Sequence, residues 1–176
     1  MNLVQSLIGA ALTPARPLHV GEAMTLWSIL AALQDGRGVA MGLLHHTSDS
    51  ELKRYIEQHI RDFDDPWTKR IKEFMLEHHI SPPPPSSDKP AARESEIPPG
   101  AKFSDVEIAE MLVVMFRNGL QLVQHGLLEC LNYAMGALLV QMQADGFRDS
   151  LMLREMMEKR GWLKAPPQWH PPGAAH

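Results

Sequence analysis

Cysteine is almost absent from this chain, since Cys130 is the only one among 176 residues. A single thiol cannot form an intramolecular disulfide, and it excludes structural zinc sites built from several cysteines. Long hydrophobic runs are absent too, because none approaches the roughly 20 apolar residues that a membrane-spanning helix needs. Residues 1–13 lack the basic start of a signal peptide. We therefore expect a cytoplasmic protein that is neither exported nor embedded in a membrane.

A strong excess of charge is also missing. The formal net charge is −4, with 22% charged and 44% hydrophobic residues, which is typical of an ordinary globular protein. Such a balance gives no electrostatic reason to expect nucleic acid as a partner. A chain of this length can bury a sizeable core within one domain, so no second domain is needed.

Motifs that carry catalysis or bind a cofactor are missing as well. No glutamate is followed by a histidine three residues later, which excludes the usual carboxylate-histidine pattern of di-iron helical bundles. Neither common form of the glycine-rich phosphate-binding loop occurs. No catalytic residue and no cofactor is therefore predicted, and the chain is more readily interpreted as a binding or structural protein than as an enzyme.

Proline is present in quantity, and its distribution divides the chain. Residues 81–102 contain a run of four prolines followed by three more, so they cannot form a helix and are predicted to be an extended linker. The linker is far longer than a turn between neighbouring helices, which indicates a crossover along the length of a bundle. Residues 1–17 are interpreted as an N-terminal arm and residues 162–176 as a proline-rich C-terminal tail.

The segment before the linker is predicted to form two helices, at residues 18–46 and 48–79. The first has one seam with alternating spacings of three and four, at His19, Glu22, Leu26, Ile29, Leu33, Gly36, Ala40 and Leu43. Ser48 and Glu51 have the spacing of a capping box at the start of the second helix. Pro66 is expected to kink or split that helix, because its ring clashes with the preceding turn.

The segment after the linker is predicted to form two more helices, at residues 104–131 and 134–160. Ser104 and Glu107 form a second capping box. Gly119 and Gly126 lie on the heptad seam and would let a neighbouring backbone approach closely. One helix over this whole stretch would be about 85 Å long, so a turn is expected near residues 131–133.

These segments together predict an all-α, ferritin-like, up-down four-helix bundle domain over residues 18–161. Its long crossover joins the second and third helices. A bundle of this type often holds metal between its helices, and three inward positions offer ligands: His19, Glu22 and His59. A transition-metal or redox site built from them is one hypothesis. The simpler interpretation is a buried Glu22 that is paired with a hydrogen-bonding or cationic neighbour.

Methionine supplies a further hypothesis. Eleven methionines, concentrated in the third and fourth helices, are typical of core filling, but they are also compatible with a cavity that carries a small ligand. Such a carrier would need a sizeable pocket between those two helices.

Three segments of the chain resemble a known family. They are similar to segments of uncharacterised proteins of spore-forming bacteria. The three segments are Leu18-His19-Val20-Gly21-Glu22-Ala23, the entry to the third helix at Ile97-Pro98-Pro99-Gly100-Ala101-Lys102-Phe103, and the ending Gly161-Trp162-Leu163-Lys164-Ala165-Pro166-Pro167. Members of that family are often labelled spore coat or coat-F-like proteins. The resemblance covers about residues 18–167 and implies a ferritin-like four-helix bundle without an established activity.

From the resemblance and the residues together, we expect a non-enzymatic structural or assembly protein that is associated with the spore. It would act through the surfaces of its bundle and would associate with itself, as a dimer, and with other spore proteins. The alternative is a metal-binding or redox protein with a non-standard Glu and His site.

Overall fold

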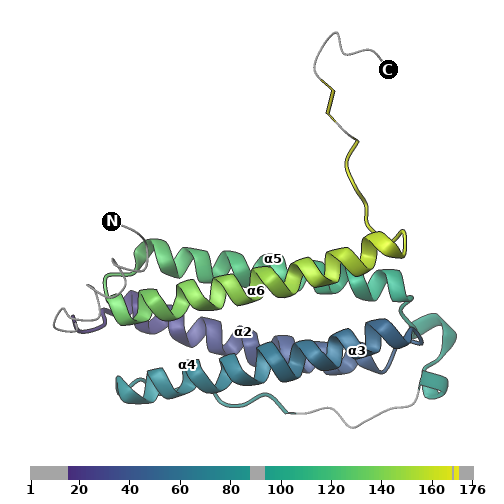
Figure 1. The fold of residues 1–176 in the computed structure, drawn as a ribbon. Helices are drawn as coiled ribbons and strands as arrows, with labels where there is room; N and C mark the ends of the chain where they lie inside the picture. The colour runs from purple at the N-terminus through teal and green to yellow at the C-terminus, as the bar shows by residue number, and fades with distance from the viewer. Residues whose placement is uncertain (1–15, 88–93, 168, 171–176) are drawn as a thin grey trace.

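A computed structural model describes residues 16–87, 94–167 and 169–170. Long helices lie side by side along one axis, and the described residues contain no β-strand (Figure 1). The all-α bundle expected from the sequence is therefore confirmed. Within the same residues, none of the helices has the length and apolar character that crossing a membrane requires.

Four rods make up the bundle. The second of them is continuous but contains one π-helical turn, and two short 3-10 turns lie within the crossover. The elements are α2 (Val20–Leu44), α3 (Ser50–His59), the π turn η1 (Ile60–Asp64), α4 (Asp65–Glu77), the 3-10 turns η2 (Glu94–Glu96) and η3 (Pro99–Ala101), α5 (Asp105–Glu129) and α6 (Tyr133–Lys159).

Contacts at the two ends of the bundle establish the direction of each rod. Arg160, after α6, forms an ion pair with Asp49 at the start of α3, so α6 ends where the second rod begins. At the opposite end, the carbonyl of Glu129 in α5 lies close to His19, which precedes α2. The order is therefore up, down, long crossover and a second antiparallel pair, as predicted.

The proline-rich crossover returns along the bundle. Ser86 donates a hydrogen bond of 2.8 Å to Asp35 of α2, and Pro83 is buried. At the far end, the ring of Phe103 packs against His46 with a centroid distance of 5.1 Å. The linker thus brings the chain from the end of α4 to the opposite end of the bundle, where α5 begins.

One of the two predicted capping boxes is wrong. The N-cap of the second rod is Asp49 and not Ser48, because the carboxylate of Asp49 accepts the backbone N–H groups of Glu51 and Leu52. An aspartate at this position also interacts favourably with the helix dipole. The second box, between Ser104 and Glu107, is present at the start of α5.

The local disturbance expected at Pro66 is present as a π turn just before it, and the rod continues past the proline. Pro66 lies in the first turn of α4, where a missing N–H group is tolerated, and the π turn η1 comes directly before it. The N–H group of Asp65 donates to the carbonyl of Ile60, five residues back. The extra residue in this turn lets the rod continue past the proline and changes which side chains face inward.

The core is made by the inward stripes of all four rods, in two hydrophobic clusters. One includes Ile56, Leu112 and Leu153, and the other includes Leu30, Trp67 and Leu139. Of the two glycines expected to let a neighbouring backbone approach, Gly126 is closely packed, but against a side chain: a Cβ there would lie 2.4 Å from Cγ2 of Thr25. The expectation for Gly119 is wrong, because a Cβ there would meet no atom within 4 Å.

Candidate functional site

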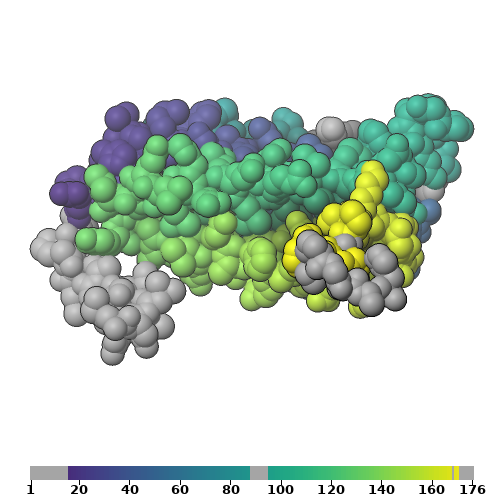
Figure 2. All heavy atoms as spheres, turned by 90° about the horizontal axis from the view of Figure 1, so that it is seen from above, coloured from purple at the N-terminus to yellow at the C-terminus, as the bar shows by residue number. Residues whose placement is uncertain are grey.

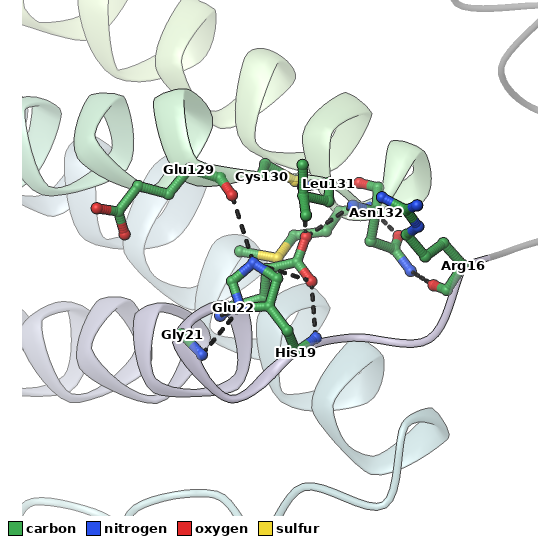
Figure 3. A network of polar contacts seen from close by, with 9 residues as sticks. Arg16, His19, Gly21, Glu22, Glu129, Cys130, Leu131 and Asn132 are labelled. Atoms are coloured by element: carbon green, nitrogen blue, oxygen red, sulfur yellow. Dashed lines mark hydrogen bonds and ion pairs between the residues drawn. The ribbon is translucent and has the colours of Figure 1, made fainter.

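The carboxylate of Glu22 holds the first helix to the turn between α5 and α6. Its Oε1 accepts the backbone N–H groups of Leu131 and Asn132, both at 2.7 Å, and its Oε2 accepts the N–H of His19 at 2.9 Å (Figure 3). Burial opposes the charge on Glu22, but these backbone donors outweigh it and hold the pKa of the carboxyl below its usual value. Glu22 is therefore a charged acceptor saturated by the main chain.

His19 and Asn132 complete this clamp. Nδ1 of His19 accepts the N–H groups of Gly21 and Glu22, so that the imidazole caps α2 while its Nε2 lies 3.4 Å from the carbonyl of Glu129. The side chain of Asn132 accepts the N–H of Met135. It also donates to the carbonyl of Arg16 (Figure 3). The groups around Glu22 thus fix the ends of two helices.

A second polar cluster lies inside the bundle, around His59. Nδ1 of the imidazole lies 2.5 Å from Oδ2 of Asp149 in α6, and Nε2 lies 3.4 Å from Oδ2 of Asp64 in the π turn. The ring stacks on Phe63, with a centroid distance of 5.5 Å, and meets the edge of Phe116. An acidic partner on each side and aromatic rings on the faces hold the imidazole in one orientation.

Burial and charge shift the proton affinities in this cluster. Burial raises the pKa of Asp64 to about 6, with the charge of His59 acting against the shift and that of Asp149 adding to it. For His59 burial acts to lower the pKa, but the hydrogen bond to Asp149 and the two carboxylate charges raise it overall. Both groups therefore hold a proton more tightly than they would in water.

A cavity of ≈ 310 Å³ adjoins this cluster. His59 and Asp64 lie in its wall, and nearly all its other lining side chains are apolar. Three glycines in its wall, Gly36 of α2, Gly119 of α5 and Gly146 of α6, contribute no side-chain volume. Its wall is exposed at Ala32 and Asn118, so it opens between α2 and α5.

The structure brings His19 and Glu22 together but places His59 in the other cluster. The part of α2 beside His59 in the cavity wall spans residues 29–36, whereas Glu22 lies about two turns earlier. Among the described residues, no group of three or more His, Cys, Asp or Glu side chains is arranged to hold a metal ion. The three candidates therefore do not form one site in this structure.

Sequence reasoning missed Asp64 and Asp149, although a signal was present. Asp64 continues the inward positions Ile60, Trp67 and Ile71, and Asp149 continues Met142, Gly146, Leu153 and Met156, both with spacings of three and four. An acidic residue on such a seam must be buried or paired. The cavity also differs from the expected pocket between α5 and α6, because residues of every rod line it.

Comparisons with known proteins agree with this fold. The chain is 26% identical over 151 residues to the uncharacterized protein YvdQ of Bacillus subtilis (strain 168), covering 86% of this chain and 88% of YvdQ. It also matches the crystal structure of a "putative spore coat protein" from Bacillus halodurans C-125, with a TM-score of 0.84 and 24% identity, over 89% of this chain and 98% of that one. At that identity the match shows a common fold.

The family comparison covers almost the whole sequence, since a single family model matches residues 8–174. The resemblance to uncharacterised proteins of spore-forming bacteria is thereby confirmed, both by this match and by the two Bacillus proteins. The chain belongs to the family described as "Protein of unknown function (DUF3231)".

Proposed function

We propose that this chain is a structural, non-enzymatic protein of the spore that assembles with a second copy of itself through α6. The observation that carries the proposal is a second heptad seam on the outside of that helix. Six successive seam positions, spaced four and three residues apart, are all apolar and all exposed: Tyr133, Ala137, Val140, Ala144, Phe147 and Leu151. The four large side chains among them are exposed by 59%, 36%, 57% and 42%.

The spacing of this outer seam identifies the kind of partner. Apolar residues that alternate at intervals of three and four are the pattern by which one helix packs into another. The inner seam of α6, which includes Met135, Leu139 and Met142, is already buried in the bundle. The exposed apolar residues of α2, at Val20, Met24 and Trp27, extend over only two such intervals. We therefore infer that the partner is a helix and that it binds α6.

The order of large and small residues favours a second copy of α6 in the antiparallel direction. A two-fold axis near residue 142 would place Ala137 opposite Phe147 of the partner copy. It would also place Val140 opposite Ala144 and Tyr133 opposite Leu151. Each alanine then faces a larger side chain, so the two surfaces interdigitate without voids. Residues 133–144 contain no charged side chain, and the acidic and basic residues of the second half of α6 would therefore meet no like charge.

The outer face of α6 is exposed at every position of this seam. Seen from above, α5 and α6 together form most of the surface turned toward the viewer, and the C-terminal tail lies over the end of α6 (Figure 2). A shallow groove between the two helices, with a volume of ≈ 190 Å³, lies beside Phe147. This face can accept another long helix.

Association with the spore is supported by the family and by the name of the similar Bacillus halodurans protein. A dimer of long bundles offers a repeated surface that other spore proteins can bind. The location is tested by expressing a fluorescent fusion in a sporulating Bacillus strain. The proposal requires the signal at the periphery of the spore, whereas a signal confined to the mother-cell cytoplasm would contradict it.

Self-association is tested by light scattering of the purified chain. We expect the wild type to have twice the monomer mass and Phe147→Glu to have the monomer mass. The matched control is Met24→Glu, which adds the same charge at an equally exposed position on α2 and should leave the dimer intact. A monomeric wild type, or equal effects of the two substitutions, would contradict the proposal.

A further inference from the structure

The cavity in the bundle is large enough to hold an organic molecule. Its volume of ≈ 310 Å³ is about twice that of an engineered apolar cavity of roughly 150 Å³ that binds benzene. Aliphatic and aromatic side chains from all four rods form most of its wall, including Ile29, Phe63, Leu112, Phe116, Val123 and Met142. An apolar body of about ten non-hydrogen atoms fits such a space.

One carboxylate oxygen in the wall of this cavity, Oδ2 of Asp64, lacks a hydrogen-bond donor among the described residues. Asp64 is only 3% exposed. Nε2 of His59 lies 3.4 Å from this oxygen. A buried carboxylate oxygen without a donor is costly, and a ligand that supplies one would remove the cost.

The cluster also carries one negative charge in excess. Asp149 already engages Nδ1 of His59, so this imidazole can balance only one of the two carboxylates when all three groups are ionised. The group that best completes the site is therefore a cation that donates hydrogen bonds. A carboxylate ligand would face Asp64 and be repelled.

We propose that this cavity binds a small amine, with an apolar body among the four rods and one ammonium group paired with Asp64. The aliphatic and aromatic wall selects the body, and the carboxylate oxygen that lacks a hydrogen-bond donor selects the head group. His59, held by Asp149, fixes the position of the carboxylate and does not itself need to contact the ligand. The ligand would enter between α2 and α5, beside Ala32 and Asn118.

The proposal is tested by isothermal titration calorimetry near pH 7.5 with 2-phenylethylamine and with 2-phenylethanol, which differ only in the head group. We expect the wild type to bind the amine at least tenfold more tightly than the alcohol. Asp64→Asn keeps the shape of the side chain but removes its charge. It should weaken amine binding at least tenfold and change alcohol binding less than threefold.

Filling the cavity provides a second test that does not depend on the charge. Gly119→Leu introduces a side chain where a Cβ meets no atom within 4 Å, so the variant should fold and bind neither compound. Gly38→Ala is the control, because its Cβ also meets nothing and Gly38 does not line the cavity. The proposal is overturned if the wild type binds no amine, if the alcohol binds equally well, or if Gly119→Leu leaves binding unchanged.

Discussion

His59 and Asp64 face each other although they are five residues apart in one helical rod. In an α-helix, positions five apart differ by about 140° around the axis and point to different faces. The π turn from Ile60 to Asp64 widens the helix so that residues five apart become neighbours, and Nε2 of His59 lies 3.4 Å from Oδ2 of Asp64. The π turn therefore creates the polar wall of the cavity.

The pH dependence of stability should depend on Asp64. Its folded pKa of about 6 lies above the ordinary value of 3.8, so the native state binds more protons than the unfolded state between these values. Stability contributed by this group is full below about pH 4 and is lost as the pH rises through 6. His59, whose pKa is also raised, acts in the same direction at higher pH.

The side chain introduced by Asp64→Asn does not titrate. The stability of this variant relative to the wild type should therefore increase as the pH rises. A difference of about 2 pKa units corresponds to roughly 3 kcal/mol in the free energy of unfolding over the whole titration, of which about 2 kcal/mol falls between pH 4.5 and pH 7.5. Urea denaturation of both proteins at pH 4.5 and pH 7.5 measures the change. Parallel pH profiles would show that Asp64 does not titrate as a buried group.

Two glycines of α5 should respond in opposite ways to the same substitution. Gly119→Ala adds a methyl group in open space and improves helix propensity, so it should stabilise the fold by about 1 kcal/mol. Gly126→Ala should destabilise it, because the new Cβ would lie 2.4 Å from Cγ2 of Thr25 and 3.2 Å from Leu139. Thermal unfolding followed by circular dichroism gives both values, and a change of the same sign in both would be inconsistent with this packing.

The clamp around Glu22 should be important for stability. Glu22→Ala leaves the backbone N–H groups of His19, Leu131 and Asn132 without their acceptor, which should lower the free energy of unfolding by about 3 kcal/mol. The control is Glu129→Ala, where the lost side chain is exposed and the effect should stay within about 0.5 kcal/mol. Equal effects in chemical denaturation would rule out the clamp.

Cys130 should react slowly with alkylating reagents. Burial and the neighbouring carboxylate of Glu22 raise the pKa of the thiol to about 11, so little thiolate is present at pH 8. Glu22→Gln removes the charge and should accelerate the reaction with iodoacetamide several-fold. If the folded wild type reacted as fast as a free cysteine, the raised pKa of the Cys130 thiol would be contradicted.

The helices, the crossover and the inward seams could be predicted from the sequence, because spacings of three and four residues and a run of prolines are local signals. The position of the π turn could not, since the hydrogen bond from Asp65 to Ile60 depends on how the rod accommodates Pro66 within the bundle. The pairing of His59 and Asp64 could not be predicted for the same reason, because an α-helical wheel places these two residues on different faces.

The candidate site, too, could be predicted from the sequence only in part. Glu22 was identified as a buried acid that needs a partner, but its partners are backbone groups of a turn more than one hundred residues away. Backbone donors of this kind leave no motif in the sequence, so they could not be predicted. The open space at Gly119 could not be predicted either. A glycine on a seam gives the same sequence pattern whether a backbone or a cavity lies beside it.

Disulfide trapping tests the central claim, self-association through antiparallel copies of α6, most directly. In a Cys130→Ser background, the pair Ala137→Cys and Phe147→Cys places the new thiols opposite each other across the proposed two-fold axis, whereas the pair Ala137→Cys and Val140→Cys does not. Under mild oxidation we predict a covalent dimer for the first pair and little for the second. Equal cross-linking of both pairs, or none in either, would contradict the account.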